Sequence, residues 1–177
     1  MENMAWDGEW RPFFDFIAET LRRFSSQRDK QKGESYVHGF TLAQTCLTNL
    51  YLPISELDAG PVRAGTGPVR TGTKATGRRT QFGNGPAPTE VAGGYADIYL
   101  QPRLGVYPDM KHSYVLELKY LPGRATEAEV STAREKAVEQ LTRYADAVAI
   151  ERSYKPTTLH RLILLWRGWQ LAVAEEI

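Results

Sequence analysis

The chain has 177 residues, of which 42% are hydrophobic and 24% charged, and its net charge is +1. This length fits a single domain over residues 1–177, and the composition is that of an ordinary globular protein. The near balance of charge excludes a global attraction to nucleic acid or to membranes. The first ten residues lack the apolar core of a signal peptide, and no apolar run is long enough to cross a bilayer. We therefore expect a soluble, cytoplasmic protein whose one cysteine, Cys46, forms no intrachain disulfide.

Helical periodicity dominates the first fifty residues. One apolar repeat predicts a helix over about residues 10–25. Its members are Phe13, Ile17, Leu21 and Phe24. A second helix, with Cys46 buried in it and Glu34 near its start, follows from a second repeat. That repeat consists of Tyr36, Phe40, Ala43, Leu47 and Leu50. Next, YLPISEL predicts a short edge strand, because an edge tolerates Pro53.

Residues 59–89 differ in composition from the rest of the chain. They are rich in Gly, Pro, Thr and Ala and contain five basic residues but no acidic one. Such a segment has almost nothing to bury, so we expect a flexible insertion. It is either a solvated loop or a basic arm that contacts nucleic-acid phosphates. The candidates for phosphate contacts are Arg70, Lys74, Arg78 and Arg79.

The second half of the chain alternates between strands and a helix. Strands are predicted over 95–101 and 113–121, and Thr126 with Glu129 forms a capping box that begins a helix. The apolar stripe of this helix runs through Val130, Ala133, Ala137, Leu141, Tyr144 and Val148. TLHRLILLW then predicts a buried strand, and Arg167-Gly168 a tight turn into a last strand, WQLAVA. The whole is an α/β domain with one mixed central sheet and flanking helices.

Two of these strands carry charge in their middle. Asp97 lies in YADIYL, and Glu117 precedes Lys119 by two residues in YVLELKY. Because side chains alternate between the two faces of a strand, Glu117 and Lys119 share one face. If the strands pair, Asp97 and Glu117 can lie side by side, and two such carboxylates repel each other unless a cation lies between them. This face either meets water or forms a site for a hard divalent ion.

The arrangement GGYADIYLQP … YVLELKY … AVEQLTRYA resembles the PD-(D/E)XK nuclease superfamily. It is also similar to the nuclease-like half of bacterial proteins that join this domain to an AAA-type ATPase-like domain. The resemblance implies the restriction-endonuclease-like fold, with an αβββαβ core. It also implies a metal-dependent nuclease that acts on DNA.

The resemblance assigns a role to each matching residue. Mg²⁺ or Mn²⁺ would be held by Asp97, Glu117, the backbone carbonyl of Leu118 and Glu34. Catalysis would use Asp97, Glu117, Lys119 and Gln140, with Lys119 positioning or deprotonating the attacking water. Contacts to nucleic acid would come from Lys136 and Tyr144. We also considered a metal clamp of Glu34 with His38, four residues apart; His112 and His160 show no partner spacing and are assigned structural roles.

Two features depart from the family pattern. The link before the Asp97 strand is usually a short turn, whereas here it is the insertion at 59–89. No phosphate-binding loop of the G-x-x-x-x-G-K-[ST] type is present, so the sequence contains no ATPase half. The alternative function is an inactive nuclease-fold module that binds nucleic acid or a protein partner such as a separate ATPase. For either function, the chain could also form a homodimer. A purely structural domain with a solvated strand face is a third reading.

Overall fold

The computed structural model describes residues 1–25, 33–58, 95–145 and 156–177. The insertion at 59–89, with its four candidate phosphate-binding residues, lies outside the described residues. The helices are α1 (Glu2–Trp6), α2 (Arg11–Phe24), α3 (Gly33–Cys46) and α4 (Glu127–Ala145). The strands are β1 (Tyr51–Asp58), β2 (Tyr95–Pro102), β3 (His112–Leu121), β4 (Thr158–Arg167) and β5 (Gln170–Glu176). From α3 to β4, the order of elements is the predicted αβββαβ.

The strands described form one mixed sheet in the order β1-β2-β3-β4-β5. β3 and β4 are parallel, and the other neighbouring pairs are antiparallel. The parallel pair requires a crossover, which α4 provides between β3 and β4. β1 lies at an edge, as Pro53 predicts, and β3 lies at the centre of the sheet.

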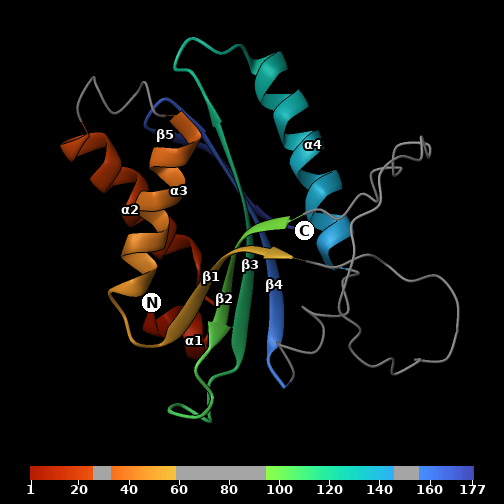
Figure 1. Ribbon diagram of the computed structural model, residues 1–177. Coiled ribbons are helices and arrows are strands. Elements are labelled where there is room, and N and C mark those ends of the chain that lie inside the picture. Colours follow the sequence, from red (N-terminus) through yellow and green to blue (C-terminus); the bar gives the residue numbers. More distant parts are fainter. Residues whose placement is uncertain (26–32, 59–94, 146–155) are drawn as a thin grey trace, which may run out of the picture.

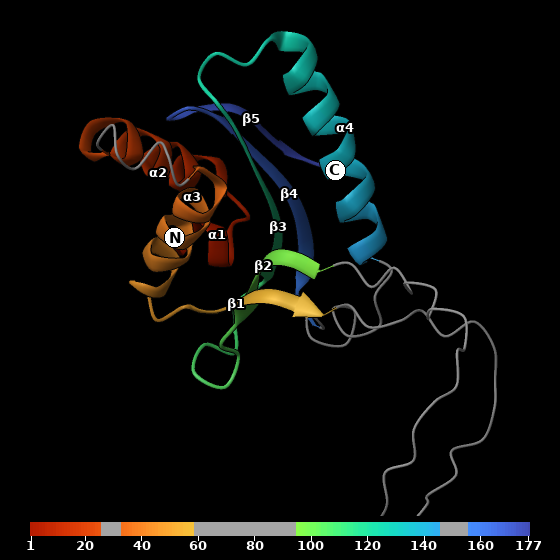
Figure 2. The ribbon, with the colours of Figure 1, turned by 45° about the horizontal axis from the view of Figure 1, so that its top comes forward.

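Helices cover both faces of the sheet (Figure 1). α2 and α3 lie on one side and α4 on the other, and the view in Figure 2 shows α1 on the side of α2 and α3. On that side the sheet contributes Tyr114, Leu116 and Leu118 of β3 to the main core. On the α4 side, Val115 of β3 packs with Tyr99, Ala137, Leu141 and Ile163. The alternation predicted for β3 is therefore confirmed, and both of its faces are buried.

The two N-terminal helices differ in detail from their sequence patterns. α2 buries Phe14, Ile17 and Leu21, whereas Phe24, at its last position, is 79% exposed. α3 ends at Cys46, so the prediction that the apolar repeat continues as helix to Leu50 is wrong. Cys46 is exposed, not buried, because it lies at the end of the helix. The five-residue α1 has no amphipathic repeat to announce it, although Met4 and Ala5 are fully buried.

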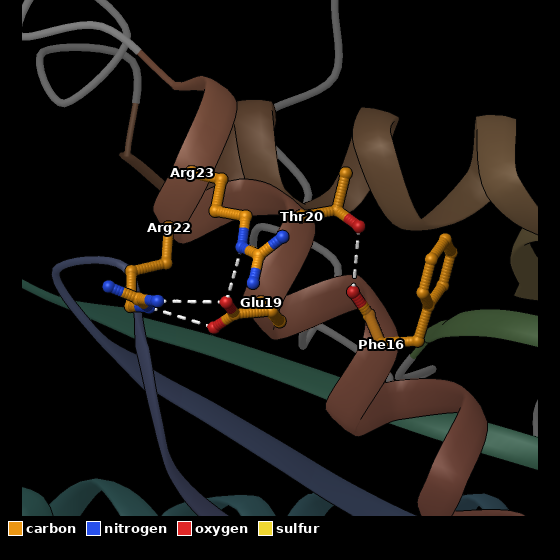
Figure 3. Close-up of polar contacts among 5 residues, drawn as sticks. All are labelled: Phe16, Glu19, Thr20, Arg22 and Arg23. Carbon is orange, nitrogen blue, oxygen red and sulfur yellow. Dashed lines mark hydrogen bonds and ion pairs between the residues drawn. The ribbon is translucent and has the colours of Figure 1, made fainter.

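The outer side of α2 carries a small exposed network of charges (Figure 3). Glu19 accepts hydrogen bonds from Arg22 at 2.8 Å and from Arg23 at 2.6 Å. These bonds lower the pKa of Glu19 to about 2. Because all three side chains are solvent-exposed, the network adds little to stability, and the packed face determines the position of the helix.

The predicted capping box and the β4–β5 turn are both confirmed. The Thr126 backbone N–H donates to the Glu129 carboxylate at 2.7 Å, and the Glu129 N–H donates to Thr126 Oγ1 at 3.3 Å. Gly168 in the turn has φ +61°, a left-handed conformation that favours glycine. None of the helices in the described part of the chain is long and apolar enough to span a membrane.

Candidate active site

Strands β2 and β3 separate where the predicted carboxylates lie. Their described pairing runs from Leu100↔Tyr114 to Ile98↔Leu116, and one further step of this register would place Asp97 opposite Glu117. There the side chain of Asp97 bonds to the neighbouring strand: its Oδ2 accepts a hydrogen bond of 2.7 Å from the Leu118 N–H. The carboxylate of Asp97 is thus fixed against β3, between the two strands.

Glu117 is a buried charged residue. Its side chain lies on the face of β3 that α4 covers and is 1% exposed. Burial, reinforced by the negative charge of Asp97, raises the pKa of Glu117 to about 7, against the opposing effect of Lys119. Glu34 adds a smaller effect in the raising direction. The reading in which this strand face meets water is therefore wrong for Glu117.

Lys119 is the direct partner of Glu117. Its Nζ lies 2.7 Å from Glu117 Oε1, and its side chain is 21% exposed. Burial by itself would lower the pKa of Lys119, but the hydrogen bond and the charge of Glu117 raise it above its ordinary value. The ammonium group of Lys119 therefore stays protonated at neutral pH and acts as a hydrogen-bond donor.

The first turns of α3 bring further polar groups to Asp97. Glu34, Ser35 and His38 line a cavity of about 270 Å³ together with Asp97 and Leu118. His38 Nε2 lies 3.1 Å from the backbone oxygen of Asp97. Because α3 precedes β2 by a long stretch of chain, only the fold brings these residues together.

A larger cavity lies between β3 and α4. It has a volume of about 520 Å³, and Lys119, Lys136 and Gln140 are among its lining residues. Lys119 therefore lies between the buried Glu117 and a solvent-accessible hollow that holds a second lysine. The lining includes these two lysines and one acidic residue, Glu129, so its charge suits an anionic ligand.

The donor groups fit a hard divalent cation. Glu117 Oε2 is buried and has no hydrogen-bond partner among the described residues, although a buried carboxylate oxygen ordinarily has one. Asp97 and Glu34 lie close enough for their charges to raise the pKa of Glu117, and a cation would relieve this repulsion. Among the described residues, no group of three or more His, Cys, Asp or Glu side chains is arranged to bind a metal ion. Mg²⁺ needs only one or two carboxylates, since water completes its coordination.

A family model decides the class to which this chain belongs. The model of the PD-(D/E)XK nuclease superfamily matches residues 87–176, just over half of the chain. The chain belongs to the PD-(D/E)XK nuclease superfamily. The matched span contains Asp97, Glu117, Lys119 and Gln140, whereas Glu34 lies before it. No curated protein and no solved structure matches this chain.

The fold brings most of the predicted PD-(D/E)XK residues together, in two adjoining groups. Glu34, Asp97 and Leu118 line the smaller cavity. Lys119, Lys136 and Gln140 line the larger one, and Glu117 contacts Lys119 from within the protein. The side chain of Tyr144, near the end of α4, lies outside what the structure describes, as do the four basic residues of the insertion.

Sequence reasoning missed two sets of contacts in this PD-(D/E)XK domain. It gave His38 no link to Asp97; the only available signal was its position one helical turn after Glu34. It also left His112 and His160 without partners. In the structure His112 Nδ1 lies 2.8 Å from His160 Nε2, and His160 Nδ1 lies 2.6 Å from Glu176 Oε1. Nothing in the local sequence announces this chain of contacts, because it depends on three neighbouring strands.

Proposed function

We propose that this protein is a metal-dependent nuclease that hydrolyses phosphodiester bonds in DNA. The observation that carries the proposal is the buried Glu117 carboxylate, with one oxygen on Lys119 and the other without a partner among the described residues. Such an oxygen costs free energy unless a cation or a donor satisfies it. The superfamily consists largely of nucleases, which supports the same reaction class.

Asp97 and Glu117 would hold one or two Mg²⁺ or Mn²⁺ ions. Glu34 and the backbone carbonyl of Leu118 would add oxygen ligands from the α3 side and from β3 itself. When bound, the ion supplies a lowered pKa for water and compensation for negative charge on the reacting phosphate. The ionised form of Glu117, which burial alone disfavours, is the form that such a site requires.

Lys119 would position the attacking water and stabilise charge on the phosphate. Its raised pKa keeps the ammonium group protonated, which favours this role over removal of a proton from water. Glu117 fixes the ammonium group at 2.7 Å, so that a donor stands ready before substrate arrives.

Substrate contacts would come from the larger cavity and its surroundings. Gln140 would hydrogen-bond beside Lys119, and Lys136, one helical turn before it, would contact a phosphate. Tyr144 and the basic residues of the insertion, Arg70, Lys74, Arg78 and Arg79, remain candidates for further contacts with the nucleic acid. DNA is proposed as the substrate because the family resemblance implies it.

The test is cleavage of plasmid DNA, single-stranded DNA and RNA with Mg²⁺, Mn²⁺ or EDTA. Wild type is compared with Glu117→Gln and Lys119→Met, and with Glu139→Gln as a matched control on the exposed surface of α4. We expect metal-dependent cutting of DNA by wild type and by the control. Both site variants should lose at least about a hundredfold in rate.

Each outcome distinguishes the proposal from its alternative. If wild type binds DNA but cuts it with neither metal, the protein is a binding module and not an enzyme. Cutting that survives Glu117→Gln would remove this carboxylate from the site. Cutting of RNA in preference to DNA would keep the reaction class and change the substrate.

A further inference from the structure

His38 connects three elements at the edge of the candidate site. It lies on α3, and its Nε2 is 3.1 Å from the backbone oxygen of Asp97 in β2 and 3.3 Å from Ser55 Oγ in β1. Its side chain is half-buried and also lines the smaller cavity with Glu34. The ring therefore joins the helix to the two strands that end beside the site.

The Asp97 contact identifies which ring nitrogen carries a proton. A carbonyl oxygen can only accept a hydrogen bond, so His38 Nε2 must donate to Asp97. Ser55 Oγ, the more distant of the two partners, can then only be the second acceptor of a bifurcated hydrogen bond from the same N–H. A protonated Nε2 has no lone pair for a metal, which argues against the clamp of Glu34 with His38 through this atom.

At Asp97 the main chain of β2 parts from β3, although β2 stays paired with β1 on either side of this residue. The described pairing stops at Ile98↔Leu116, and beyond it the Asp97 carboxylate reaches across to the Leu118 N–H. Asp97 is therefore fixed from two directions: its side chain by β3, and its backbone oxygen by His38. A shift of the backbone would move the carboxylate away from Glu117.

We propose that His38 is a positioning residue, which fixes the main chain of Asp97 and thereby directs its carboxylate toward Glu117. For metal binding the inference rests on the proposed function, in which Asp97 is a ligand. The local geometry does not depend on the proposed function, because the hydrogen bond from the Leu118 N–H to the Asp97 carboxylate joins two groups of the protein itself.

The test uses the full chain with three variants. His38→Leu removes the donor, and His38→Gln retains an N–H at about the reach of Nε2. Ser55→Ala removes the second neighbour of the ring without touching the Asp97 carbonyl. Two quantities are measured for each variant: Mn²⁺ affinity by calorimetry without substrate, and hydrogen exchange of the Leu118 amide in EDTA.

We expect His38→Leu to weaken Mn²⁺ binding about tenfold, the usual effect of removing a group that orients a ligand. Exchange of the Leu118 amide should quicken in the same variant. His38→Gln should restore both quantities to within about threefold of wild type, and Ser55→Ala should leave both unchanged. If His38→Leu does not fold, His38→Asn replaces it, because its shorter amide stops short of the Asp97 carbonyl.

Two results would overturn the inference: His38→Leu with the amide protection of wild type, or His38→Gln as impaired as His38→Leu. If His38 served only general stability, His38→Leu and His38→Gln would both lower the unfolding midpoint. Mn²⁺ affinity and amide exchange would then not differ between the variant that keeps a donor and the one that lacks it. Failure of wild type to bind Mn²⁺ would count against the proposed function and the metal-binding consequence. The Leu118 amide would still decide whether His38 positions Asp97.

Discussion

Replacing Glu117 with glutamine should stabilise the metal-free protein at alkaline pH while it abolishes cleavage. The buried Glu117 carboxyl has a pKa raised from 4.5 to about 7 by burial and by Asp97. The folded state therefore holds a proton that the unfolded state releases between these two pH values. Stability from this group is present below pH 4.5 and is lost as the pH rises through 7.

The size of the effect follows from the same pKa. At about 1.36 kcal/mol per pKa unit, the difference between 4.5 and about 7 corresponds to about 3 kcal/mol. The Glu117 side chain is 1% exposed, so solvent screening does not reduce this value. Glutamine resembles the protonated acid in shape and charge, and its amide can donate toward Asp97. We expect Glu117→Gln to raise the free energy of unfolding by up to about 3 kcal/mol at pH 8.5, and by less than about 1 kcal/mol at pH 5.

Urea unfolding in EDTA, followed by the fluorescence of the buried Trp166 and Trp169, measures these differences at both pH values. The exposed control, Glu139→Gln, should stay within about 0.5 kcal/mol of wild type. Saturating Mg²⁺ should stabilise wild type but not Glu117→Gln, since only a ligand that binds the folded state shifts the equilibrium. A Glu117→Gln protein less stable than wild type at pH 8.5 would refute the reasoning. It would mean that the contact with Lys119 outweighs burial and the repulsion from Asp97.

Three further predictions follow from other contacts. Lys119→Met should destabilise the protein by about 3 kcal/mol at pH 8.5, because it leaves the buried Glu117 charge uncompensated, whereas in a chain that already carries Glu117→Gln it should cost less than about 1 kcal/mol; an equal cost in both backgrounds would contradict this. Thr126→Ala should cost about 1 kcal/mol in urea unfolding through loss of the helix cap, whereas Thr126→Ser should be near neutral; equal losses would rule out capping. Burial and the neighbouring His160 lower the pKa of His112, so its contribution to stability is present above about pH 6.5 and is lost as the pH falls below it. His112→Gln should therefore flatten the fall in urea midpoint between pH 7 and 5, and an unchanged slope would assign that fall to other groups.

The local sequence determined the type of most elements and the faces of the strands. Alternation along β3 placed Glu117 and Lys119 on one face, and the Thr126–Glu129 spacing predicted the start of α4, because both patterns depend only on backbone geometry. The order of charged motifs also indicated the family, which the match over residues 87–176 bears out. The sequence patterns did not predict α1, which has no apolar repeat, or the end of α3, which comes before its apolar pattern ends.

Only the tertiary structure decided the environment of those charges. The sequence left open whether Glu117 faces water, and the packing of α4 over β3 buries it. It could not say that β2 separates from β3 at Asp97, nor that α3 brings Glu34 and His38 to the same place. The physical reason is common to all of these features. Periodicity fixes which way a side chain points, whereas its pKa, its burial and its partners depend on residues that are distant in the chain and adjacent only after folding.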